Sequence, residues 1–305
     1  MKVIVAGGSG FVGKNFIKLA QKNWEIHAIY NTSKDFPNWC KQFKNVKAWQ
    51  CDLLDEEQAK KIAHKIGDYD VCLFTVANTL PLEAESNPTK DLQLNVFTLM
   101  NFLKQFSGKR FIFFSTGTVY LGQKGKANDN GPFNSTSPYA ISKLTAESYV
   151  KFYSKKGKIS SYFIVRWMGA YGPYEPERKP FTQMIRAFKE RKENKFTIYG
   201  DGKNLIDRMH IDDTIRAIML MIKAKKANTT FQLCDKRGMT VLESVKRAAK
   251  TFGIKNLKIE KKGTVTLKSE YWPDPLQQKK AIGFIPKIKY EEGMKRFAKF
   301  LENQK

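Results

Sequence analysis

The chain has 305 residues, enough for one large domain or two closely associated ones, and 42% of them are hydrophobic. Its mean hydropathy is −0.47 and no apolar run approaches the ~18 residues that a membrane span needs, which excludes a transmembrane protein. Met1 leads directly into an apolar run, so we expect no signal peptide. The cysteines lie far apart without metal-ligand spacing, and we therefore expect reduced thiols, no metal site and a cytoplasmic location.

The formal charge of +25 has several possible meanings. Nucleic acid, an acidic membrane or an anionic substrate would each favour a basic protein. The lysines are nevertheless spread along the whole chain, without an arginine-rich block or a basic arm. A lysine-rich surface is the simplest interpretation, and a polyanionic small substrate fits equally well. We expect neither a membrane nor a nucleic-acid partner.

The first thirteen residues predict a strand, a glycine turn and a helix. Val3–Val5 are apolar, as in a strand buried on both faces, and glycines follow at positions 7, 10 and 13. Gly7 allows a tight turn, Gly10 lets the backbone approach a pyrophosphate, and Gly13 lets helix and strand pack closely. The positive end of the helix favours the same anion. We expect a dinucleotide site formed by Gly7, Ser9, Gly10, Phe11, Val12 and Gly13.

Glu25–Tyr30 predicts the second strand, and the residues after it bear on the choice of cofactor. NAD-binding units commonly place an acid there for the ribose hydroxyls. Here the sequence continues Asn31-Thr32-Ser33-Lys34, with no acid before Asp35. Small donors and a lysine suit a 2′-phosphate better. We therefore expect NADP(H), held by Asn31, Ser33 and Lys34, with NAD(H) as the alternative and an ordinary loop as the simpler interpretation.

Further strands and helices alternate along the chain. We predict strands over 46–51, 70–77 and 110–115, and a long helix over 85–106 that contains Asn95. This alternation indicates an α/β fold, a Rossmann-type doubly wound parallel sheet. Asp52 follows the third strand, where it could accept from an adenine amino group or cap the next helix. Ligands of such sheets bind beyond the carboxyl ends of the strands, where we place Asp52, Leu53, Val76 and Ala77.

The fifth strand ends in STGTVY, Ser115 to Tyr120, which should face the same crevice. A polar loop over 122–136 follows, and a helix then opens at Ser137-Pro138 with an N-cap serine. Tyr139 and Lys143 lie one turn apart on that helix. A nearby ammonium lowers the pKa of a phenol, so such a tyrosine can act as general acid or base near neutral pH. The lysine can also hold a ribose hydroxyl.

Together these residues resemble the extended short-chain dehydrogenase/reductase family of nucleotide-sugar epimerases, dehydratases and reductases. The resemblance covers nearly the whole chain and rests on several motifs in the family's order. They are GGSGFVG (7–13), Asp52-Leu53, Asn95, STGTVY (115–120), SPYAISK (137–143), Arg166 with AYGP (170–173), YGDGKN (199–204), HIDD (210–213) and the closing AIGFIPKIKYEEGM (281–294).

The resemblance implies a catalytic triad of Thr116, Tyr139 and Lys143. Thr116 would hydrogen-bond the reacting sugar oxygen, and Tyr139 would give or take the proton. Lys143 would tune Tyr139 and hold the nicotinamide ribose. Asn95 is carried over as a cofactor residue, and Thr118 as a substrate contact beside Thr116. The helices at 85–106 and around Tyr139 resemble the pair that forms the family's dimer, so we expect a homodimer that binds a nucleotide sugar.

Three departures from the family's motifs bear on which of the family's reactions and substrates we expect. The 4,6-dehydratases carry Asp-Glu after the catalytic threonine, whereas this chain has Gly117-Thr118, which disfavours dehydration. The usual Asn after Arg166 is Gly169. The arginine that often grips the substrate pyrophosphate falls on Ile206, and Arg208, two residues on, could replace it or be a surface residue. We interpret His210 as structural and Asp212-Asp213 as capping the following helix.

We expect residues 1–166 to form the dinucleotide-binding domain, with 205–225 returning to it. Residues 167–204 and 226–305 should form the substrate-binding lobe. Three functions compete. The first is NADPH-dependent reduction of a nucleotide-linked 4-keto-6-deoxy sugar. The second is a nucleotide-sugar epimerase with tightly bound NAD. The third, supported only by the charge, is a non-catalytic protein of this fold that binds RNA or senses cofactor.

Overall fold

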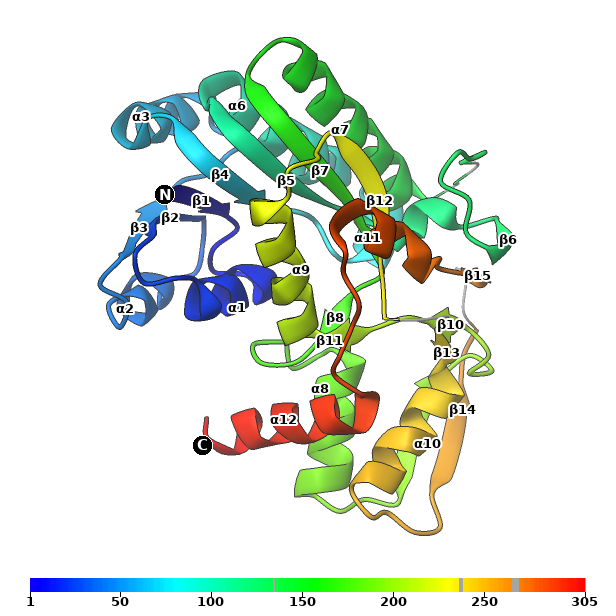
Figure 1. The fold of residues 1–305 in the computed structure, drawn as a ribbon. Helices are drawn as coiled ribbons and strands as arrows, with labels where there is room; N and C mark the ends of the chain where they lie inside the picture. The colour runs from blue at the N-terminus through cyan, green and yellow to red at the C-terminus, as the bar shows by residue number, and fades with distance from the viewer. Residues whose placement is uncertain (134, 136, 236–237, 265–268, 305) are drawn as a thin grey trace. The chain divides into compact units, whose positions relative to one another are not determined.

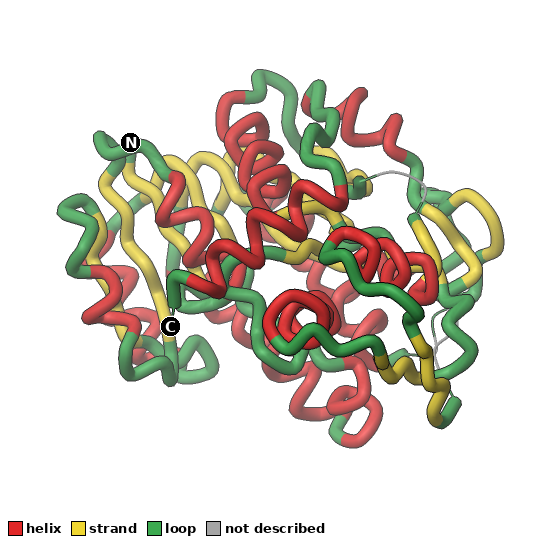
Figure 2. Tube along the Cα trace, turned by 90° about the horizontal axis from the view of Figure 1, so that it is seen from below, coloured by secondary structure: helices red, strands yellow, loops and turns green. Residues whose placement is uncertain are grey.

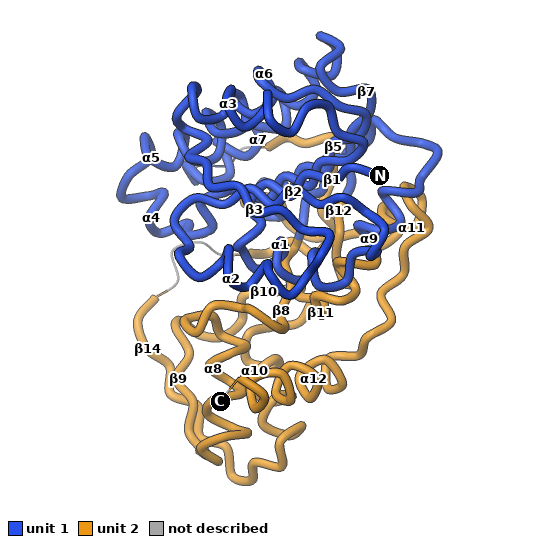
Figure 3. The backbone as a smooth tube through the Cα atoms, turned by 90° about the vertical axis from the view of Figure 1, so that its left-hand side faces the viewer, with its two compact units in different colours: residues 1–119, 135–167, 217–231 blue, residues 120–134, 168–216, 232–305 orange. Residues whose placement is uncertain are grey.

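A computed structural model describes residues 1–133, 135, 137–235, 238–264 and 269–304. The chain divides into two compact units, which Figure 3 distinguishes by colour. Unit 1 comprises residues 1–119, 135–167 and 217–231, and unit 2 comprises residues 120–134, 168–216 and 232–305. Among the described helices, none combines the length and the apolar character required to cross a membrane.

Unit 1 is built on a parallel sheet of seven strands, in the order β12-β7-β5-β4-β1-β2-β3. The strands are β1 (Lys2–Ala6), β2 (Glu25–Tyr30), β3 (Val46–Gln50), β4 (Tyr69–Phe74), β5 (Gly108–Thr116), β7 (Ile159–Trp167) and β12 (Thr229–Leu233). Every neighbouring pair from β3 to β7 is parallel. The strand order reverses between β1 and β4, and this is the point where doubly wound sheets bind their ligands. The predicted fold class is confirmed.

Helices cover both faces of this sheet (Figure 1). They are α1 (Phe11–Leu19), α2 (Phe36–Cys40), α3 (Glu56–Ile66), α4 (Pro81–Ser86), α5 (Pro88–Leu92), α6 (Thr98–Gln105), α7 (Pro138–Lys155) and α9 (Ile211–Lys223), whose end belongs to unit 1. In Figure 2 the strands run side by side near the N-terminus, with helices around them. The core under α3, α6 and α7 is aromatic; Phe74, Phe102, Phe111 and Phe113 are fully buried.

The prediction of a single long helix over residues 85–106 is wrong. Asn87 leaves the helical region (φ −143°, ψ 76°) because Pro88 follows it, and its side chain caps α5 by accepting from the Lys90 amide. A π-helical turn (η1, Gln93–Phe97) then separates α5 from α6. Such turns occur frequently at functional sites, and this one contains Asn95.

The described residues of unit 2 form short strand pairs and four further helices. The strands are β6 (Lys124–Lys126), β8 (Ala170–Tyr171), β9 (Lys195–Tyr199), β10 (Leu205–Ile206), β11 (Met209–His210), β13 (Met239–Thr240), β14 (Lys258–Lys262) and β15 (Glu270–Trp272). The helices are α8 (Pro180–Ile185), α10 (Val241–Thr251), α11 (Pro275–Ile282) and α12 (Tyr290–Glu302), with the short π-helical turn η3 (Arg186–Glu190). The 3₁₀ turn η2 (Gly117–Tyr120) follows β5 and lies in unit 1 except for Tyr120. Tyr171, Phe181 and Tyr290 pack in its core.

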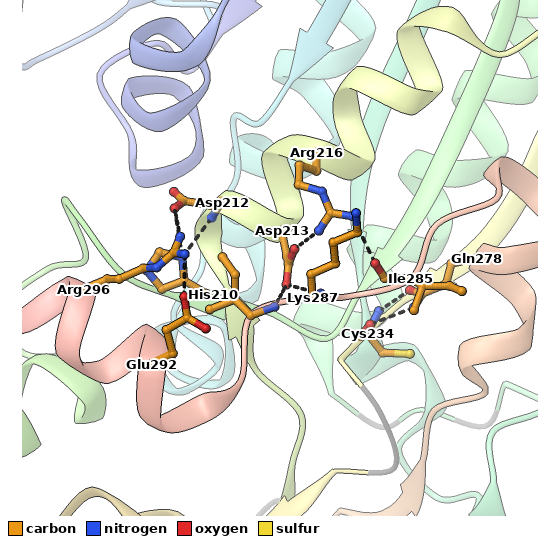
Figure 4. A network of polar contacts seen from close by, with 11 residues as sticks. His210, Asp212, Asp213, Arg216, Cys234, Gln278, Ile285, Lys287, Glu292 and Arg296 are labelled. Carbon is orange, nitrogen blue, oxygen red and sulfur yellow. Dashed lines mark hydrogen bonds and ion pairs between the residues drawn. The ribbon is translucent and has the colours of Figure 1, made fainter. Parts of the chain in front are cut away.

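A polar network at the start of α9 anchors the closing segment of unit 2 (Figure 4). The Asp213 carboxylate accepts from the backbone amides of Lys287 and Ile288, both at 2.9 Å, and pairs with Arg216. His210 is buried, and its Nδ1 accepts from the Asp212 amide at 3.3 Å. Because α9 begins at Ile211, Asp212 and Asp213 lie in its first turn and do not cap it as expected.

Candidate active site

The glycine turn after β1 leaves no room for side chains. Gly7 has φ +88°, and a Cβ there would lie 2.6 Å from Thr75 Oγ1, at the end of the neighbouring strand β4. That hydroxyl donates to the Ala6 carbonyl at 2.9 Å and so joins the carboxyl ends of β1 and β4. A Cβ on Gly13 would lie 2.4 Å from the Gly7 carbonyl oxygen. Both positions therefore require glycine, as expected.

The turn presents the start of α1 as a cradle for an anion. Gly10 is the N-cap and has no side chain to cover the first helical turn, and it is exposed. Its amide donates to the Gly7 carbonyl at 3.0 Å, which fixes the loop, while Ser9 and Phe11 are half-buried. A Cβ at Gly10 would be close to the Gly7 carbonyl, at 3.2 Å. An uncapped helix start behind a glycine turn fits the pyrophosphate of a dinucleotide.

The other expected cofactor residues lie at the ends of neighbouring strands. Asn31 and Lys34 are exposed and Ser33 is half-buried in the loop between β2 and α2. Asp52 does not cap a helix; its Oδ1 accepts from the Leu54 amide at 2.9 Å, and Asp55 caps α3 instead. The backbone after β4 carries Val76 and Ala77, both half-buried, and Leu53 is buried.

Asn95 is fully buried and acts within the protein. Its Oδ1 accepts from the Asn78 amide at 2.9 Å, which positions the segment that carries Val76 and Ala77. Its Nδ2 donates to Asp91 and to Ser142, both at 2.9 Å. Asn95 therefore links the segment after β4 to α5 and α7. The sequence indicates only Asp91 among these partners, by its position one helical turn before Asn95, whereas Asn78 and Ser142 are 17 and 47 residues away.

Thr116 ends β5 and pairs with Thr118. The Thr116 hydroxyl donates to the Thr118 hydroxyl at 2.9 Å and accepts from the Thr118 amide at 3.1 Å. Thr116 is buried with 8% exposure, while Thr118 is half-buried. Two hydroxyls at the carboxyl end of a central strand are suited to hydrogen-bonding a polar substrate group.

Helix α7 brings Tyr139 and Lys143 onto one buried face. Tyr139 is 9% exposed and Lys143 is 1% exposed. The Lys143 ammonium lies 4.2 Å from the centroid of the Phe113 ring, which places it over β5. Ser137 is the N-cap and Pro138 opens the helix, as expected, although the Ser137 side chain makes no capping hydrogen bond.

Burial also changes the pKa of the Lys143 side chain. Desolvation lowers the pKa of Lys143 from its ordinary 10.5 to about 7, although the charges of Glu147 and Asp91 oppose this effect. Glu147 lies one turn further along α7 and is itself 2% exposed. It is a residue that the sequence analysis missed, and its signal was an acid four residues after the lysine on the same helix face.

In unit 2, Arg208 occupies the space beside Gly169. Gly169 has φ +110°, and a Cβ there would lie 2.8 Å from the Arg208 Cδ and Nε atoms. Arg208 Nη1 donates to the carbonyls of Met168 and Asp207. Arg208 can therefore occupy this position only because residue 169 has no side chain. Ile206, where the family often has arginine, packs against the core of unit 2.

The low pKa of Lys143 predicts a specific pH dependence of stability. Between about pH 7 and 10 the folded chain has lost this proton while the unfolded chain still holds it, so the contribution of Lys143 to stability grows as the pH rises. Lys143→Met removes this contribution. The free energy of unfolding of the wild type minus that of the variant should therefore increase from pH 7 to pH 9 in urea titrations. Lys61→Met, an exposed change on α3, should give a flat difference; a flat difference for Lys143→Met contradicts the low pKa.

Comparison with known proteins identifies the family of this chain. The model of the "NAD dependent epimerase/dehydratase family" matches residues 3–234. A "Putative UDP-glucose 4-epimerase" of Methanocaldococcus jannaschii is 26% identical, over 99% of this chain and 98% of its own. The solved UDP-glucose 4-epimerase of Thermotoga maritima, with UDP-glucose, superposes with a TM-score of 0.89 at 23% identity over 100% of this chain and 99% of its own. The structure of RMD from Pseudomonas aeruginosa, complexed with NADPH, superposes with a TM-score of 0.79 at 19% identity, over 100% of this chain and 99% of its own. The chain belongs to the NAD-dependent epimerase/dehydratase family.

Proposed function

We propose that the protein is a nucleotide-sugar 4-epimerase in which Thr116, Tyr139 and Lys143 act on the reacting sugar carbon and its oxygen. The observation that carries this proposal is the buried pair on α7, Tyr139 and Lys143, packed on the strand that ends in Thr116. The full-length similarity to a putative epimerase supports the same reaction. Gly117 and Thr118 stand where a dehydratase would need an acid and a base.

Each residue has a distinct part in this reaction. Thr116 and Thr118 offer two coupled hydroxyls to the sugar oxygen. Tyr139 takes the proton of the 4-hydroxyl as C4 is oxidised and returns it when C4 is reduced on the other face. The Lys143 cation favours the tyrosinate that forms in between. The dinucleotide, held by the glycine turn before α1, supplies hydride transfer to and from C4.

The second candidate is NADPH-dependent reduction of a nucleotide-linked 4-keto-6-deoxy sugar. It uses the same three residues, with Tyr139 donating its proton to the carbonyl oxygen as hydride arrives. The observation in its favour is the loop after β2, where exposed Asn31 and Lys34 offer donors and a positive charge and no acid precedes Asp35. That composition suits the 2′-phosphate of NADP(H).

We propose that Arg208 holds the phosphates of the nucleotide sugar. Burial lowers the pKa of the nearby Lys179, and the charges of Arg208 and Arg178 lower it further. Burial raises the pKa of Glu175, which lies beside these cations, to about 7, so this carboxyl is only partly ionised near neutral pH and offsets only part of their charge. A bound diphosphate would relieve their repulsion.

We propose that the protein is cytoplasmic. Its four cysteines are buried and free, as is usual in a reducing compartment.

The identity of the retained cofactor distinguishes the two candidates. We expect denaturation of the purified protein to release NAD, because an epimerase regenerates its cofactor at each turnover and keeps it bound. The released nucleotide is identified by chromatography and mass, and the emptied protein is titrated with NADH and NADPH. An empty site with a clear preference for NADPH would instead establish the reductase.

Tyr139→Phe removes the proposed proton carrier and little else. We expect turnover of UDP-sugars to fall by about 10²–10⁴-fold, since that is the usual contribution of a positioned general acid or base. Cofactor affinity should be unchanged. The matched control is Tyr149→Phe, a half-buried tyrosine of the same helix, which should keep its activity. If Tyr139→Phe retains full turnover, the proton is carried by another group.

We further propose that unit 1 forms a homodimer through η1, α6 and α7. These elements pack together and expose Phe97, Ile141 and Phe152 with about half of each side chain uncovered (46%, 49% and 47%). A hollow beside Phe97 is lined by Leu54, Gln93, Met100 and Asn101. We expect Phe97→Glu to convert a dimer to a monomer in light scattering, whereas Leu19→Glu, at an exposed leucine of α1, should not. A wild-type chain that is monomeric at all concentrations contradicts the proposal.

A further inference from the structure

A buried ion pair joins α7 to the sheet beneath the proposed active site. The Glu147 carboxylate accepts from Arg166 Nε at 3.1 Å and from Arg166 Nη2 at 2.8 Å, and the Ser115 hydroxyl donates to it at 2.6 Å. All three residues are at most 4% exposed. Burying two charges costs much of what their attraction returns, so well-packed apolar residues would often stabilise the fold equally well. Stability alone therefore does not explain this ion pair, and its position suggests a role in the reaction.

The pair contacts every element that carries a proposed reacting group. Glu147 lies one turn after Lys143 and two turns after Tyr139 on α7, and all three side chains are buried. Ser115 directly precedes Thr116 at the end of β5. Arg166 is the cross-strand partner of Ser115 in the register of β5 with β7. One carboxylate thus connects the helix of Tyr139 and Lys143 to the strand of Thr116.

The charged groups around Lys143 come from three elements. Glu147 lies on its own helix, Asp91 faces it from α5, and Arg166 reaches Glu147 from β7, whereas β5 contributes the neutral Phe113 ring and Ser115. Burial lowers the pKa of Lys143 and the two carboxylates raise it, Glu147 more than Asp91. Asp91 already accepts from Asn78, Asn95 and Ser142. Glu147 also accepts from three donors, but it is the stronger electrostatic support of the Lys143 cation because its effect on the Lys143 pKa is the larger of the two.

We propose that Glu147 is a positioning residue for the reaction: clamped by Arg166 and Ser115, it keeps Lys143 cationic near neutral pH and holds the end of β5 against α7. The part of this inference that concerns turnover rests on the proposed function. The part that concerns the charge of Lys143 does not, and it can be measured without any sugar.

The test follows the ionisation of Lys143 directly. In protein labelled with ¹³C at the lysine Cε, the Lys143 signal is assigned by its absence in Lys143→Met, and its titration midpoint should lie at about pH 7 in the wild type. Glu147→Gln keeps the shape and removes the charge, so the midpoint should fall by about one pH unit or more. Glu147→Asp retains the negative charge, so its Lys143 midpoint should lie close to that of the wild type. Glu56→Gln, a partly exposed glutamate of α3, is the matched control and should leave the midpoint in place.

A double variant keeps the test valid if Glu147→Gln alone unfolds the protein. Glu147→Gln with Arg166→Met removes both charges and leaves no unpaired ion in the core. The Lys143 midpoint should again fall, but by less than in the single variant, because losing the repelling Arg166 cation offsets part of the loss of the Glu147 charge. A wild-type midpoint in both the single and the double variant overturns the proposal.

Kinetics separate the inference from the proposed function. With an active nucleotide sugar, the basic limb of the kcat profile should move to lower pH in Glu147→Gln by the same interval as the Lys143 midpoint, with cofactor affinity retained. A uniform loss of kcat at all pH values, with an unmoved limb, would show a merely structural role and overturn the proposal. If the midpoint moves but no nucleotide sugar is turned over, the proposed function fails while the role of Glu147 in charging Lys143 stands.

Discussion

The close approach of the β1 turn, the start of α1 and the end of β4 is the constraint on which the rest of unit 1 depends. A side-chain carbon at Gly7 or Gly13 would lie within 2.6 Å of Thr75 Oγ1 or of the Gly7 carbonyl oxygen. Real Cβ atoms do not tolerate such contacts, so only glycine lets helix and strands converge here. Since the strand order reverses between β1 and β4, this convergence lies at the point where doubly wound sheets bind their ligands.

A second constraint is the cost of burying charge on α7. Lys143 is as inaccessible as the phenylalanines around it, and desolvation alone would leave it neutral at physiological pH. The fold counters this with carboxylates on two sides, Asp91 and Glu147, each held by its own hydrogen-bond donors. The result is a lysine whose pKa lies near neutrality, where small changes in its surroundings alter its charge. A group in this state can respond to the ionisation of a tyrosine one turn away.

The order of strands and helices could be predicted because each strand is a short apolar run and each turn has its own residues. Val3–Val5 and Glu25–Tyr30 are found where the sequence indicates them. The break at Asn87 could have been inferred from Pro88, but the π-helical turn around Asn95 could not. Besides a bond to Asp91 one turn earlier, Asn95 makes long-range hydrogen bonds to Asn78 and Ser142, which come from two other segments. Local propensity contains no information about such contacts.

The same distinction applies to the site. The glycine turn and the Tyr139–Lys143 spacing are local features, and the sequence is sufficient to predict them. Glu147 is also on that helix, yet its partners lie on β5 and β7, so its burial and its pairing with Arg166 are visible only in three dimensions. Gly169 and Arg208 are a similar case in unit 2. In the sequence the glycine is a departure from the family and the arginine is a separate residue 39 positions later, but in space the glycine leaves the room that the arginine occupies. A change at one position is therefore explained by the other, and neither should be interpreted alone.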